Sequence, residues 1–164
     1  MLTQDIDQVA APAPSGERSI HRVLVAFDGS DRAWTALRRG IAIALDNHAQ
    51  LTIAAVVPSA APLACGLPGT MVMPYSPDAL QRELETEMEQ MLAAARDEIP
   101  AAVSVTTRLL HGRASRVLER LAEEGGYDLV VTGPRPMSRL GRLLHRSVTQ
   151  RLLARGHVSV LAVK

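Results

Sequence analysis

Three observations predict an α/β protein with an open, parallel five-stranded sheet and helices on both of its faces. Short runs that are almost wholly apolar suit strands buried on both sides of such a sheet. Segments with apolar residues at helical spacing alternate with these runs, and glycine- and proline-containing segments separate them. Strands that alternate with helices form parallel sheets through right-handed crossovers.

The first third of the chain holds two of the strands and one helix. A strand is predicted over 21–27, and a second one over 51–57. Ser30 can cap the helix between them, because its hydroxyl accepts from an amide of the first turn. The positions expected to face the core are Trp34, Leu37, Ile41, Ala44 and Leu45. The following stretch, 58–77, is rich in proline and glycine and predicts a long loop.

The middle of the chain predicts two helices around a third strand. The first helix begins at Pro77 or Asp78 and ends near Glu98. Its expected buried stripe is Leu80, Leu84, Met88, Met91 and Ala95. A strand is predicted over 102–110, followed by a helix that Gly125 ends. The residues of that helix expected to point inward are Val117, Leu118 and Leu121.

The last part of the chain predicts a fourth strand, a loop, a short helix and a terminal strand. The fourth strand covers 127–133, and residues 134–146 form a loop of glycine, proline and arginine. The short helix runs from Ser147 to Arg155, and the fifth strand covers 157–164. Ligands of open parallel sheets bind beyond the carboxyl ends of the strands, where the strand order reverses. The turns after the strands are therefore the candidate functional segments.

Length and composition indicate one globular domain with a flexible leader. The chain has 164 residues, of which 47% are hydrophobic and 21% charged, as in ordinary globular proteins. Residues 1–19 lack periodicity and contain the linker-like AAPAPSG, so the domain is predicted over 20–164. We expect the leader, residues 1–19, to be dispensable for folding. Cys65 is the one cysteine, which excludes a disulfide within the chain and a cysteine-clustered metal site.

Charge and aromatic content exclude several classes of partner. The net charge of +1 gives no general attraction to nucleic acid, and an aromatic content of 2% is too low for base-stacking platforms. The sequence contains no apolar run near the ~18 residues of a membrane span. The early acidic residues do not fit a secretory signal, so we expect a cytoplasmic protein without nucleic-acid or membrane partners. Acidic residues are concentrated in 78–98 and arginines in 135–164. Both segments can be solvated faces, or the arginine-rich segment can form an anion site or a charged surface for a partner.

Four segments in order resemble the universal stress protein family: RVLVAFDGS, HGRAS, DLVVTGPRP and RSVTQRLLARGHVSVLAVK. The resemblance covers 21–164. It implies a sheet of order 3-2-1-4-5, a cytoplasmic protein and usually a homodimer. Some members bind ATP, with magnesium, through a loop of glycine, two residues, glycine, nine residues, glycine, and serine or threonine.

This chain departs from that phosphate loop at two of its three glycines. Gly133 and Ser147 match the pattern, but Pro136 and Arg146 stand where glycines are expected. Glycine lets backbone amides approach a phosphate, whereas proline has no amide to donate. The helix beginning at Ser147 still attracts anions, and arginines such as Arg135 can supply charge in place of amides. ATP binding is therefore expected to be weak.

The resemblance carries over to a set of candidate site residues. In ATP-binding members the aspartate matching Asp28 faces the nucleoside, and the main chain at the position of Val56 meets adenine. Asp28 has an equally good structural explanation, since an aspartate before Gly29 and Ser30 can accept from turn amides. The full candidate set is Asp28, Val56, Gly133, Arg135, Pro136, Arg146, Ser147, Val148 and Thr149. We expect no metal site from the dispersed histidines, and no catalytic residue.

The fifth strand predicts the partner. In the order 3-2-1-4-5 it lies at an edge of the sheet, and an apolar edge needs a cover. Pairing of 157–163 with the same strand of a second copy gives a closed two-fold homodimer. Together with the family resemblance, this predicts a dimeric stress-response protein with an adenine nucleotide or other small anion in its crevice, acting by interaction and not by turnover. The alternatives are a ligand-free dimeric interaction module and a slow nucleotide hydrolase.

Overall fold

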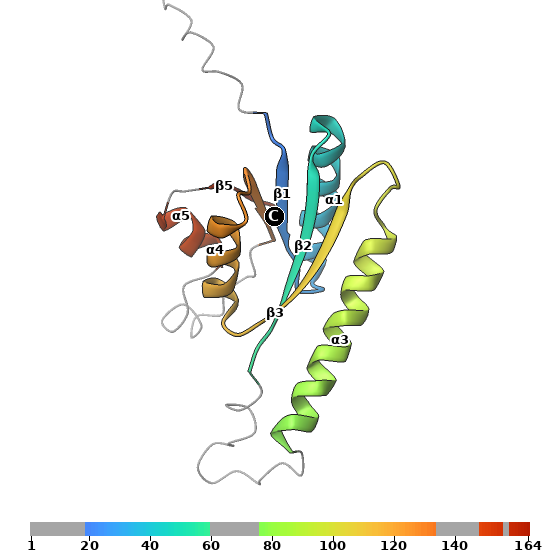
Figure 1. The fold of residues 1–164 in the computed structure, drawn as a ribbon, viewed down its shortest axis with the longest axis vertical. Helices are drawn as coiled ribbons and strands as arrows, with labels where there is room; N and C mark the ends of the chain where they lie inside the picture. The colour runs from blue at the N-terminus through green and yellow to red at the C-terminus, as the bar shows by residue number, and fades with distance from the viewer. Residues whose placement is uncertain (1–18, 60–75, 134–147, 156–157) are drawn as a thin grey trace, which may run out of the picture.

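A computed structural model describes residues 19–59, 76–133, 148–155 and 158–164. The predicted leader and the loop that contains Cys65 lie outside the described residues, except for a few at their ends. Five parallel strands form one sheet in the order β3-β2-β1-β4-β5, as predicted (Figure 1). The strands are β1 (Arg22–Ala26), β2 (Gln50–Val57), β3 (Val105–His111), β4 (Leu129–Thr132) and β5 (Ser159–Ala162).

Four described helices cover the two faces of the sheet, which confirms the predicted layers. They are α1 (Asp31–Asn47), α3 (Pro77–Asp97), α4 (Ala114–Glu124) and α5 (Val148–Arg155). α1 and α3 pack on one face, and α4 and α5 lie together on the other (Figure 1). None of the helices in these described ranges is long and apolar enough to cross a membrane.

The side-chain alternation of β1 builds both halves of the core. Val23 and Val25 join the cluster beneath α1 and α3, whereas Leu24 joins the cluster beneath α4 and α5. All three are completely buried. A strand that is buried on both faces has a continuous apolar sequence, which is why the short apolar run in the sequence located it.

Three residues predicted to face the core, Leu45, Leu80 and Leu84, lie outside the two clusters of buried apolar side chains, Leu45 because it stands beside the buried stripe of α1 and the other two because α3 extends past the sheet. Leu45, near the end of α1, is 38% exposed. Leu80 and Leu84 in the first turns of α3 are only partly buried, whereas Leu92 and Ala95 are buried. In Figure 1 the start of α3 lies beyond the end of β1. Helical spacing identifies the inward face of a helix but not where the sheet beneath it stops.

The third strand begins later than predicted. A turn in which the Val103 amide donates to the Pro100 carbonyl precedes it, and the strand runs from Val105 to His111. Its residues alternate between exposed and partly buried, because β3 is an edge strand with one face only partly covered. The apolar residues before Val105 therefore belong to the turn and not to the ladder.

Candidate functional site

Strand register brings three of the candidate residues to one edge of the sheet. Ala26 of β1 pairs with Ala54 of β2 on one side and with Thr132 of β4 on the other. Asp28 and Val56 each lie two residues beyond their paired alanines, and Gly133 follows Thr132 directly. β1 and β4 are the strands between which the order reverses, so the ligand position expected for an open parallel sheet, called the crevice below, lies at this edge.

Asp28 organises the turn that starts α1. Its Oδ1 accepts from the Ser30 amide at 3.1 Å and from the Ser30 hydroxyl at 2.6 Å. The Ser30 Oγ in turn accepts from the Ala33 amide at 3.2 Å and caps the helix, as predicted. Gly29 between them has a φ of +75°, a conformation that favours glycine. The structural explanation of Asp28 is thus realised at the rim of the crevice.

The backbone amide and carbonyl of Val56 point to the side of β2 on which β1 lies. The Gln50 amide donates to the His21 carbonyl and the Phe27 amide to the Ala54 carbonyl, so even-numbered residues of β2 face β1. Among the described residues, the bond from Phe27 is the last between the two segments at this end. Val56 is the next even-numbered residue. Its amide and carbonyl therefore face the crevice beyond the last rung of the ladder.

Gly133 lies against the backbone of α1. A Cβ added at this residue would stand 2.3 Å from the Arg32 carbonyl oxygen and 2.9 Å from the Ala33 nitrogen. Backbone atoms cannot swing aside, so close packing of β4 on the first turn of α1 already requires a glycine here. This contact accounts for the one glycine of the predicted loop pattern that this chain retains.

Thr149 is connected to the end of β4. Its Oγ1 lies 2.9 Å from the Thr132 Oγ1, and both threonines are buried. Val148 packs on the same cluster as Val56, beneath α4 and α5. The first turn of α5 is therefore fixed to the crevice side of the sheet. Thr132 was not among the predicted residues, although a hydroxyl at the end of an apolar strand was a usable signal.

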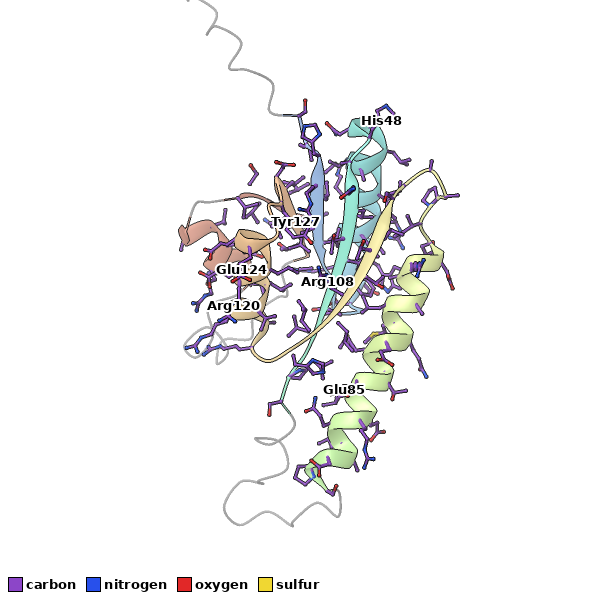
Figure 2. All side chains as sticks on the ribbon, in the orientation of Figure 1. His48, Glu85, Arg108, Arg120, Glu124 and Tyr127 are labelled. Atoms are coloured by element: carbon purple, nitrogen blue, oxygen red, sulfur yellow. The ribbon has the colours of Figure 1, made fainter. Side chains whose placement is uncertain are left out.

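The four remaining candidates belong to the segment between β4 and α5. Arg135, Pro136, Arg146 and Ser147 lie outside the described residues. His111 ends β3 and its Nε2 lies 3.0 Å from Glu85 Oε1 of α3, the helix on which Figure 2 labels Glu85. Within the described ranges no three histidine, cysteine or acidic side chains gather as they would around a metal ion.

Two contacts near the site were missed at the level of sequence. Met91 of α3 packs against the Asp28 turn, because a Cβ on Gly29 would stand 2.2 Å from its Sδ. Glu119 of α4 is buried and accepts from the Nε of Arg151 of α5. Glu119 falls at core spacing with Ser115 and Ala122, which is the signal that could have identified it.

Comparison with known proteins gives one consistent result. The model of the universal stress protein family matches residues 19–164. A universal stress protein of Thermus aquaticus is 31% identical over 143 residues, covering 87% of this chain and 97% of that protein. A universal stress protein structure from Burkholderia pseudomallei is 27% identical, with a TM-score of 0.66, covering 89% of this chain and 97% of that one.

A second solved structure is that of a universal stress protein in complex with cAMP. It is 27% identical to this chain, with a TM-score of 0.63, and the match covers 88% of this chain and 97% of that one. These matches cover almost the whole described domain, and the strand order agrees with the one that the resemblance implied. The chain therefore belongs to the universal stress protein family.

Proposed function

We propose that this protein binds an adenine nucleotide weakly in the crevice beyond β1 and β4, and that it acts as a homodimer through interaction and not through turnover. The carrying observation is the main chain of Val56. Its amide and carbonyl face the crevice beyond the last bond to β1. A neighbouring donor and acceptor in a main chain can read the edge of a purine base. The relative solved with cAMP, an adenine nucleotide, supports this choice of ligand.

The described residues fit the nucleoside end of such a ligand better than its phosphates. Val56 offers its peptide groups and Asp28 stands at the rim. At the phosphate end, the Thr149 hydroxyl is already bonded to Thr132, and Gly133 is packed on α1. Pro136 and Arg146 remove two further glycines. Magnesium would enter as the counter-ion of a triphosphate. Because the available groups lie at the nucleoside end, we expect weak binding to which the base contributes most.

Titration with a fluorescent ATP analogue, with and without magnesium, separates the proposal from its two alternatives. Weak, saturable binding without product formation supports the proposal. Absence of binding points to the ligand-free interaction module, and release of phosphate to the slow hydrolase. Tight binding by the unaltered protein would contradict our interpretation of the loop.

A double variant, Pro136→Gly with Arg146→Gly, tests the phosphate end directly. It restores one amide and removes one side chain. We expect the analogue to bind more tightly than to the parent protein, and a matched change of the exposed Arg39 to glycine to leave affinity unaltered. No gain in affinity would show that another feature limits binding.

A further inference from the structure

A carboxylate occupies a core position of α4. The buried residues of this helix are Ser115, Leu118, Glu119 and Ala122, at the spacing of a single helical stripe. Glu119 is 6% exposed and packs in a stripe whose neighbours Leu118 and Ala122 belong to the apolar cluster beneath α4 and α5. A charge removed from water in this way persists only with an opposite charge or hydrogen bonds.

Arg151 of α5 supplies that charge across the helix pair. Its Nε donates to Glu119 Oε2, although the two residues lie 32 positions apart in the sequence. The Arg151 side chain keeps 27% of its surface exposed, against 7% for Glu119. The carboxylate is therefore the deeply held member, and the guanidinium spans from it to the surface. α4 and α5 lie side by side at this point (Figure 1).

The pair acts on a helix that cannot hold its own position. α5 has eight residues, and so short a helix is unstable without tertiary contacts. Its other described anchors include buried Leu152, Val148 on the apolar cluster, and the hydroxyl contact between Thr149 and Thr132. The guanidinium is planar and directional, so it fixes how the helix is turned as well as where it lies.

We propose that Glu119 and Arg151 are positioning residues that orient α5 at the crevice and thereby control ligand affinity without touching the ligand. α5 carries Val148 and Thr149 at its first turn, the part nearest the end of β4. A small rotation of α5 moves this turn relative to Thr132. The effect on affinity rests on the function proposed above, whereas the orientation of α5 does not.

A specific replacement separates orientation from mere stability. Removing one member of a buried pair is strongly destabilising, but replacing both members by apolar residues is often neutral for stability. Glu119→Met with Arg151→Met keeps the volume and removes the directional contact. If the pair orients α5, this double variant recovers the stability that Arg151→Met alone loses without recovering the native position of α5.

The experiment measures three quantities in the full chain: the thermal midpoint, hydrogen exchange of the amides of 152–155, and affinity for the fluorescent ATP analogue. In the double variant we expect a near-native midpoint, with exchange in α5 and the dissociation constant each raised about fivefold or more. Arg120→Met with Glu124→Met is the matched control, since both residues are exposed on α4 (Figure 2). This control should leave all three quantities unchanged.

Two results would overturn the inference. One is native exchange in α5 of the double variant, and the other is faster exchange that is equal throughout the domain. If the unaltered protein binds no analogue, the proposed function fails, but exchange in α5 still decides whether the pair orients the helix. If exchange rises in α5 and affinity stays native, the claim of control over the ligand is wrong.

Discussion

Gly133 is the residue at which a functional and a structural explanation can be separated. The family pattern places this glycine in a phosphate loop, whereas the structure places it against the Arg32 carbonyl. The two explanations predict different stabilities for the ligand-free protein, because only the packing contact with Arg32 contributes to its unfolding free energy. Sequence alone could not distinguish them, since the contact partner lies about a hundred residues away.

Replacing Gly133 with alanine should destabilise the protein in the absence of ligand. The added Cβ would lie 2.3 Å from a backbone oxygen, so β4 or α1 must shift. Overpacking of this kind costs roughly 1–3 kcal/mol in unfolding free energy. Chemical denaturation would measure the loss, with Ser59→Ala, exposed beyond β2, as the control. An unchanged denaturation midpoint would show that the Arg32 contact is not close.

Asp128 makes a pH-dependent contribution to the stability of the fold. It lies at the amino ends of β1 and β4, opposite the candidate site. Its Oδ2 accepts from the His21 amide at 2.8 Å and from the Arg22 amide at 2.9 Å. The bond from the His21 amide is the largest cause of a pKa for Asp128 below its usual 3.8, and that from the Arg22 amide acts in the same direction, while the loss of hydration around the carboxylate opposes both. A carboxylate with a lowered pKa stabilises the folded state above its ordinary pKa, and this contribution is lost as the pH falls through the folded value.

Asp128→Asn should therefore lower the thermal midpoint at neutral pH and have little effect in acid. The difference from the parent protein should shrink below about pH 4, where the parent carboxyl also becomes protonated. Midpoints measured from pH 2 to 8 check this, with the exposed Asp46→Asn as the control. A difference that is the same at every pH would contradict the assigned role of the charge.

At the scale of elements, burial decides how much the sequence could predict. β1 and β4 are buried on both faces, and their apolar runs located them closely. β3 is an edge strand, and its apolar neighbours in the preceding turn displaced its predicted start. The buried stripe of α4 includes Glu119, which periodicity of apolar residues alone passes over. Elements with one exposed face need tertiary information that the local pattern does not contain.

The sequence could predict that three residues assigned to the candidate site by the family resemblance lie close together, whereas their roles stay predictions. Asp28, Val56 and Gly133 come together because parallel strands end at the same edge. The contacts that hold this edge were not predictable, because Met91 packs on Gly29 and Thr149 bonds to Thr132 from elements remote in sequence. The four loop candidates outside the described residues stay predictions.

At the scale of the whole molecule, the outer edge of β5, which no other described strand covers, is where we expect two copies to pair. The Val163 amide donates to the Thr132 carbonyl, so odd-numbered residues of β5 face β4. By the same alternation, the amide of Val160 faces the outer edge of β5. Proline is tolerated where the missing amide faces outward from an edge strand.

Val160→Pro should therefore shift a β5-paired dimer toward monomer while the domain stays folded. Sedimentation velocity measures the shift, and circular dichroism confirms the fold. Leu161→Pro is the informative comparison, because its amide faces β4 and its loss should damage the sheet itself. A folded Val160→Pro protein that remains dimeric would place the interface elsewhere, with acidic α3 against the arginine-rich carboxyl-terminal third as the next candidate, in an assembly that salt should weaken.

The central claim is that a nucleotide binds at the carboxyl edge of the sheet, beyond β1 and β4. Two-dimensional amide spectra recorded during titration with ATP test it most directly. We predict that the largest shifts occur at Asp28–Ser30, Val56, Gly133 and Val148–Thr149, while the amides of His21 and Asp128 at the opposite edge stay fixed. Shifts centred on the opposite edge, or no shifts at millimolar ATP, would contradict the account.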